Sequence, residues 1–219
     1  MSLAIFDLDN TLLGGDSDYL WGQFLVENGV VDGDFFEQEN QRFYADYQAG
    51  TLDIHKYLEF ALQPLAANEP ATMHQWRRRF LAERIRPLIL PKAKQLLQRH
   101  RDAGDILLII TATSRFVTQP IAELLNVPHL LATEVEVKDG RYTGKSFDIP
   151  CFQAGKVKRL EAWLERMRYT LEGSWFYSDS CNDLPLLNRV DHPIAVDPDA
   201  VLARYAQDKG WPIISLREA

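Results

Sequence analysis

Four short apolar runs recur along the chain, and each of them ends in polar residues. They occupy residues 3–6, 107–110, 175–177 and 193–196, and they end at Asp7, Thr111, Ser178 and Asp197. Runs of this length are typical of strands that are buried on both faces of a parallel sheet. We therefore predict parallel strands that bring polar side chains to one edge of a sheet, where open α/β sheets bind their ligands.

Between the runs lie stretches in which apolar residues recur at helical spacing. These stretches cover residues 92–103, 117–125 and 156–168, and in the last of them Val157, Leu160 and Leu164 fall on one face. The alternation of strands and helices predicts an α/β fold with a doubly wound, Rossmann-like parallel sheet.

Residues 14–86 interrupt this alternation, because they show several helical patterns rich in Trp, Phe and Tyr. We predict an all-helical cap here, inserted into a core that consists of residues 1–13 and 87–219. Most of the aromatic side chains are expected to pack inside the cap. A smaller excursion over residues 133–143 alternates around Asp139-Gly140, which predicts a small β-hairpin.

Composition and charge exclude several classes of function. The chain has 219 residues, 46% of them hydrophobic, which is enough for one core and a small cap. A net charge of -7 with scattered basic residues argues against a nucleic-acid partner. Apolar runs fall far short of the roughly 20 residues of a membrane helix, and Asp7 follows Met1 too closely for a signal peptide. We expect a cytoplasmic protein without a membrane partner.

Two acidic segments follow predicted strands and point to a metal site. Asp7 and Asp9 are two residues apart, which places both on one face of an extended chain, and Asp179 and Asp183 follow the third run. Gathered carboxylates repel one another unless a cation compensates them. Oxygen ligands without His or Cys select Mg²⁺ over zinc. A loop of solvated acids or a helix cap is the alternative interpretation of Asp7 and Asp9 on their own.

Thr111 and Lys156 are further candidates for this site. Thr111 ends the second predicted strand, and Lys156 opens a helix after Gly155. Either residue also has an ordinary structural interpretation, since threonine is a common helix cap and a lysine at a helix start is commonly solvated.

Four segments in this order resemble the motifs of a known superfamily. They are AIFDLDNTLL, IITAT, the lysine in AGKVKRL, and FYSDSCNDLPLL, and they are similar to the motifs of the haloacid dehalogenase superfamily. The likeness is greatest to its phosphoserine phosphatase-like branch, in which a helical cap follows the first motif. The resemblance spans essentially the whole chain. It implies a magnesium-dependent phosphatase that hydrolyses a small phosphate monoester through a phosphoryl-aspartate.

The resemblance also implies a role for each motif residue. Asp7 would be the nucleophile, and Asp9 would protonate the leaving oxygen and then activate water. Thr111 and Lys156 would bind the transferring phosphoryl group. The metal site would consist of Asp7, the backbone carbonyl of Asp9, and Asp179, with Asp183 as a ligand or as an anchor behind the ligands.

The chain departs from the phosphoserine phosphatase pattern in two respects. Its fourth motif reads Ser178-Asp179-Ser180 in place of Gly-Asp-Gly, and the acid that holds the substrate ammonium has no unambiguous counterpart. Asp16 and Asp18 are candidates by position, although helix capping explains either residue equally well. A cap that can close over the site favours a small substrate, such as phosphoserine or histidinol phosphate.

Three other functions are compatible with parts of the pattern. The same motifs permit a phosphotransferase or mutase, a binding module that has lost catalysis would keep the fold, and a receiver domain also combines acids, Thr and Lys around Mg²⁺. The helical insertion argues against a receiver domain. The cap arginines are expected on a solvated face, although one that reached the site could pair with a substrate carboxylate: Arg77, Arg78, Arg79, Arg84 and Arg86. The sequence does not predict the oligomeric state.

Overall fold

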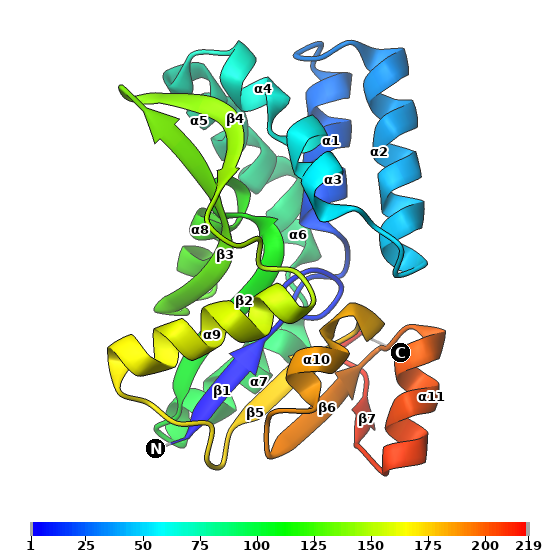
Figure 1. The fold of residues 1–219 in the computed structure, drawn as a ribbon, viewed down its shortest axis with the longest axis vertical. Coiled ribbons are helices and arrows are strands. Elements are labelled where there is room, and N and C mark those ends of the chain that lie inside the picture. Colours follow the sequence, from blue (N-terminus) through cyan, green and yellow to red (C-terminus); the bar gives the residue numbers. More distant parts are fainter. Residues whose placement is uncertain (1, 218–219) are drawn as a thin grey trace.

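A seven-stranded sheet forms the centre of the computed structural model, which describes residues 2–217 (Figure 1). Its strand order is β4-β3-β2-β1-β5-β6-β7, and neighbouring strands are parallel except for β3 and β4. The strands are β1 (Leu3–Phe6), β2 (Ile106–Ser114), β3 (His129–Lys138), β4 (Arg141–Phe147), β5 (Trp175–Ser178), β6 (His192–Val196) and β7 (Ile213–Ile214). The predicted doubly wound α/β fold is confirmed.

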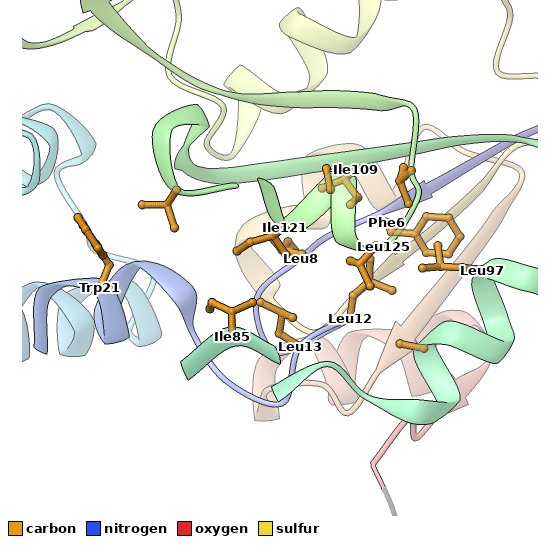
Figure 2. Packing of buried hydrophobic residues seen from close by; sticks show 14 of the residues in the cluster. Phe6, Leu8, Leu12, Leu13, Trp21, Ile85, Leu97, Ile109, Ile121 and Leu125 are labelled. Carbon is orange, nitrogen blue, oxygen red and sulfur yellow. The ribbon is translucent and has the colours of Figure 1, made fainter. Parts of the chain in front are cut away.

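Helices cover both faces of the sheet. One face packs against α7 (Pro91–Asp102) and α8 (Arg115–Leu124), and the other against α9 (Ala154–Met167), η2 (Cys181–Asp183), α10 (Leu184–Leu187) and α11 (Ala200–Lys209). Side chains of β1 alternate between these faces, with Phe6 on the first and Ile5 on the second, because successive residues of a strand point in opposite directions. Figure 2 shows Phe6 beside Leu97 of α7 and Leu125 at the end of α8.

The chain between β1 and α7 is helical and lies over the carboxyl ends of the central strands (Figure 1). It consists of α1 (Ser17–Glu27), α2 (Gly33–Gln48), α3 (Ile54–Ala61), α4 (Gln63–Ala67), α5 (Pro70–Phe80), η1 (Leu81–Ile85) and α6 (Arg86–Leu88). Trp21, Phe24 and Phe80 form its interior, with ring centroids 5.2 to 5.9 Å apart. The predicted helical cap is therefore present.

Two linkers join the cap to the core, and they lie side by side. Leu13 and Ile89 form an antiparallel bridge, and the backbone N–H of Gly14 donates to the carbonyl of Leu88 at 2.7 Å. The predicted division of the domains at residues 14 and 86 lies close to this bridge and stays a prediction.

The β3–β4 hairpin forms as predicted and reaches up beside the cap (Figure 1). Asp139 and Gly140 both have positive φ, 51° and 76°, which suits the tight turn of a hairpin. Cap and hairpin touch where Gly144 of β4 approaches Ala66 of α4. None of the helices within residues 2–217 has the length and apolar character needed to cross a membrane.

Candidate active site

Lys156 forms the centre of a buried charge cluster. Its Nζ lies 2.7 Å from Oδ1 of Asp7 and 2.8 Å from Oδ2 of Asp183, and only 3% of its side chain is exposed. The interpretation of Lys156 as a solvated helix-start lysine is therefore wrong. Burial lowers the pKa of this amine, but the carboxylates of Asp183 and Asp7 raise it by more than burial lowers it, so the pKa lies well above its usual value. The lysine is thus a fixed cation beside Asp7.

Asp7 follows β1 directly, and its backbone N–H donates to the carbonyl of Tyr177 on the neighbouring strand. Burial raises the pKa of its carboxyl group to about 7, because Lys156 only partly offsets the loss of water and the charge of Asp183 adds to the rise. The carboxylate is positioned by parallel pairing of β1 with β5, as the sequence predicted for the strand ends.

The fourth motif is held by serine and threonine hydroxyls. Thr11 Oγ1 donates to Oδ1 of Asp179 at 2.9 Å, and Ser178 Oγ donates to Oδ2 of Asp183 at 2.7 Å. The backbone N–H of Ser180 donates to Ser178 Oγ at 3.2 Å. Ser178, which replaces the first glycine of the related pattern, therefore holds Asp183, whereas Thr11 of the first motif holds Asp179. Burial and the nearby charge of Asp7 raise the pKa of Asp179 well above its usual value.

The chemistry of this donor set fits a hard divalent cation. Asp7, Asp179 and Asp183 offer only oxygen atoms, and the single charge of Lys156 pairs with two of these three carboxylates, those of Asp7 and Asp183. Within residues 2–217, no three His, Cys, Asp or Glu side chains are arranged to hold an ion by themselves. Mg²⁺ does not require such a group, since it keeps several waters and binds through one or two carboxylates.

Asp9 is held between the core and the cap. The backbone N–H of Ser17 donates to its Oδ1 at 2.6 Å, and the hydroxyl of Thr113 donates to its Oδ2 at 2.8 Å. Burial raises the pKa of Asp9 to about 6, and the charge of Asp16 contributes to the rise. Sequence reasoning missed Thr113, although one signal was present. Thr113 stands two residues after Thr111 in β2 and therefore shares its face.

Thr111 lies inside β2, so its interpretation as a helix cap is wrong. Its Oγ1 accepts a hydrogen bond from the backbone N–H of Thr113 at 3.2 Å. Ser114 is the residue that precedes α8. The strand continues beyond the predicted end because Ser114 still pairs with Thr133 of β3.

A cavity of about 40 Å³ joins these residues to the cap. The core contributes acids and threonines, whereas the cap contributes acids, aromatic rings and a few apolar groups. The lining consists of Asp7, Asp9, Thr111, Ala112, Thr113, Asp16, Asp18, Tyr19, Asn40, Phe43, Tyr44, Tyr47, Leu52, Ile54 and Tyr57. Among the described residues, no Lys, Arg or His belongs to this lining, so the cap arginines do not supply a cation there.

The two acids predicted to meet the substrate differ in their surroundings. Asp16 caps α1, because its Oδ1 accepts from the backbone N–H groups of Asp18 and Tyr19 at 2.9 Å each. Asp18 lies in the first turn of α1, and the hydroxyl of Tyr57 partly offsets the rise that burial causes in the pKa of Asp18. Burial raises the pKa of each acid to about 7. Helix capping therefore explains Asp16 but not Asp18.

Residues 4–188 match the family model of the haloacid dehalogenase-like hydrolases. The chain belongs to this family. This haloacid dehalogenase-like hydrolase is 44% identical over 220 residues to a histidinol-phosphatase of Neisseria meningitidis, and the match covers 99% of both chains. It is also 30% identical to a phosphoserine phosphatase of Mycobacterium tuberculosis, over 99% of this chain and 71% of the relative. The predicted superfamily and enzyme class, a phosphatase, are thereby confirmed.

Two solved structures share the fold of this haloacid dehalogenase-like hydrolase. A Bordetella pertussis protein of unknown function superposes with a TM-score of 0.93 at 42% identity, over 99% of both chains. A phosphoserine phosphatase solved as an analogue of its phospho-aspartyl intermediate superposes with a TM-score of 0.73 at 18% identity, over 99% of this chain and 94% of that one. The second likeness concerns the fold alone.

Proposed function

We propose that this phosphatase hydrolyses histidinol phosphate with Mg²⁺ and a phosphoryl-aspartate at Asp7. The observation that carries the choice of substrate is the lining of the active-site cavity, which combines acids and tyrosines and includes no Lys, Arg or His among the described residues. Histidinol phosphate has an ammonium group and an imidazole ring but no carboxylate. Phosphoserine has a carboxylate, and a carboxylate that is buried without a cationic partner is costly. The 44% identity to a histidinol-phosphatase supports the same choice.

The cap side of the cavity offers groups for both parts of the leaving alcohol. We assign the ammonium group to Asp18, whose carboxylate is not used to cap α1, with Asp16 close by as a second negative charge. The imidazole ring would stack on tyrosine faces, which attract flat and cationic rings alike. Tyr19, Tyr44, Tyr47 and Tyr57 line this part of the cavity.

Admission of the substrate requires the cap to move. A cavity of 40 Å³ has room for only about three or four water molecules, which is less than a phosphate ester with an imidazole ring needs. The paired linkers at Leu13 and Ile89 are where such a movement would turn, since they join the two parts. Closure would then exclude water from the reacting atoms.

The chemistry proceeds in two steps at the motif residues. An oxygen of Asp7 attacks phosphorus while Asp9 gives a proton to the departing alkoxide, which leaves as histidinol. Asp9 then takes a proton from water as that water attacks the phosphoryl-aspartate, which releases inorganic phosphate and restores Asp7. Thr111 and Lys156 would hold the phosphoryl oxygens, and Asp183 keeps Lys156 in place. When bound to Asp7, the Asp9 carbonyl and Asp179, Mg²⁺ supplies charge neutralisation at the phosphoryl group.

The test uses the full chain with histidinol phosphate as substrate. Wild-type protein that has been stripped of metal with a chelator should be inactive and should regain turnover with Mg²⁺ but not with Zn²⁺. Asp7→Asn should be inactive under every condition while its circular dichroism spectrum stays that of the folded wild type, because an amide cannot form the acyl phosphate. Turnover by Asp7→Asn above a few per cent of wild type would contradict the covalent mechanism.

A further inference from the structure

A second cavity, of about 450 Å³, lies between α8, β3 and α9. It shares no lining residue with the active-site cavity. The reason for the opening is the strand pairing. β4 pairs with β3 only from Glu134 onward, so within the described part of the chain no strand pairs with that side of residues 129–133. The cavity is larger than the active-site cavity.

The lining of this cavity is cationic, although the chain as a whole carries a net charge of -7. Four basic side chains, Arg115, Lys158, Arg159 and Arg166, face two acids, Glu134 and Asp148. Such an excess of positive charge in a concave site attracts anions. The net charge of -7 already favours solubility, so solubility does not explain these four basic side chains.

Two of the arginines are fixed in place and form the floor. Arg115 Nε donates to Oε2 of Glu134 at 2.8 Å, and its Nη2 donates to the carbonyl of Leu130 at 2.9 Å. Arg159 Nη2 donates to Oε1 of Glu134 at 3.0 Å, and only 9% of the Arg159 side chain is exposed. Both guanidinium groups are therefore ordered before a ligand arrives, which lowers the entropic cost of binding.

The other two cations are free to bind. Lys158 and Arg166 are exposed on α9, about two turns apart, and both line the cavity. Within residues 2–217, the side chain of neither residue forms an ion pair or a hydrogen bond. Beside them lie Ala162 and the buried ring of Trp163, which packs edge-on against His129 at 5.2 Å. The cavity thus offers unpaired positive charge next to an apolar wall.

We propose that this cavity is a binding site for a small organic anion, held through carboxylate or phosphate oxygens by Lys158 and Arg166 above the Arg115–Glu134–Arg159 floor. The apolar wall at Ala162 and Trp163 would contact the carbon skeleton of the ligand. The site is independent of the proposed reaction, because none of its residues lines the active-site cavity.

The experiment follows the indole N–H of Trp163 by NMR in the ¹⁵N-labelled full chain, with the signal assigned from the spectrum of Trp163→Phe. Succinate and inorganic phosphate are titrated separately at constant ionic strength up to about 10 mM, and neutral succinamide serves as the control ligand. Lys158→Ala/Arg166→Ala is compared with Lys94→Ala/Arg204→Ala, which removes two exposed cations from α7 and α11. Reading the signal at Trp163 separates this site from phosphate in the active site.

We expect a saturable shift with at least one of the two anions, and the anion that produces it identifies carboxylate or phosphate as the recognised group. The Lys158→Ala/Arg166→Ala variant should bind that anion about tenfold more weakly, and the control variant should bind it as wild type does. The proposal is overturned by the absence of a saturable shift with both anions, by an equal response to succinamide, or by equal affinities of the two double variants.

Discussion

Thr113 donates a hydrogen bond of 2.8 Å from its hydroxyl to Oδ2 of Asp9, across 104 residues of sequence. The other oxygen of Asp9 accepts from the backbone of Ser17 at the start of the first cap helix. The carboxylate is therefore oriented by one group from the core and one from the cap. Under the proposed mechanism, proton transfer by Asp9 depends on both contacts.

Replacing Thr113 by Val should lower kcat/KM for histidinol phosphate by about 10- to 100-fold, because a hydrogen bond to a charged group contributes about 1.5–3 kcal/mol. The shape of the side chain is kept, so the fold should survive. Thr113→Ser retains the hydroxyl and should keep most of the activity. Steady-state kinetics of the three proteins measure the effect. A Thr113→Val variant as active as wild type would show that this hydrogen bond does not support catalysis.

Asp9→Asn should lower turnover of histidinol phosphate by about 10²- to 10⁴-fold, since the leaving alkoxide then receives no proton. An aryl phosphate with a stable leaving group should lose much less. The two substrates can be compared by single-turnover rates of product release. Equal losses on both would speak against Asp9 as the general acid.

The central strands and the polar residues that follow them were predictable because their sequence signals are local. The apolar run at residues 3–6 coincides with β1, and Asp139-Gly140 marks the hairpin turn. Sequence patterns did not reveal α11, the first half of β3 or the two-residue strand β7. β7 is too short to carry a pattern, and the end of β2 was placed too early because its last residues are polar yet paired with β3.

The site was predictable only as far as parallel topology collects the strand ends. Lys156 donates a hydrogen bond to Asp7 across 149 residues of sequence. The order of the motifs indicated that these two residues share a site, and a buried carboxylate needs a cation beside it. The sequence did not reveal which aromatic residues form the cap interior and which line the cavity, because Trp21 and Tyr57 stand at similar helical spacings. Trp21 packs against Phe80 in the cap interior, whereas Tyr57 lines the cavity beside Asp18.

Asp18→Asn should raise KM for histidinol phosphate by about tenfold while KM for an amine-free alkyl phosphate stays unchanged, because only the ammonium group loses a charged partner. The control is Asp34→Asn, which removes an exposed acid from the first turn of α2. An equal rise in KM for both substrates would show that Asp18 does not recognise the ammonium group.

The same substitution predicts a pH dependence of stability in the metal-free, substrate-free protein. Burial raises the pKa of Asp18 from 3.8 to about 7, so the folded state binds a proton more tightly than the unfolded state does. Ionised Asp18 therefore destabilises the fold above pH 7, and this cost disappears as the pH falls from 7 towards 4. Urea unfolding should show Asp18→Asn to be more stable than wild type at pH 8, with a smaller difference at pH 5. A constant difference would contradict the shift.

Lys156→Met should lower the free energy of unfolding of metal-free protein by about 3–5 kcal/mol, because it leaves Asp7 and Asp183 buried without their cation. Lys158→Met removes an exposed lysine from the same helix and should change it by no more than about 0.5 kcal/mol. Urea titration of both variants measures the difference. Equal stabilities would mean that the buried pairing of Lys156 does not support the fold.

The most direct measurement of the proposed function is the ratio of kcat/KM for histidinol phosphate to that for phosphoserine, determined with the same Mg²⁺-loaded preparation. An acidic, aromatic cavity without a cation for a carboxylate should favour histidinol phosphate by at least about tenfold. A ratio of one or less, or the absence of turnover on histidinol phosphate, would contradict the assignment of the substrate.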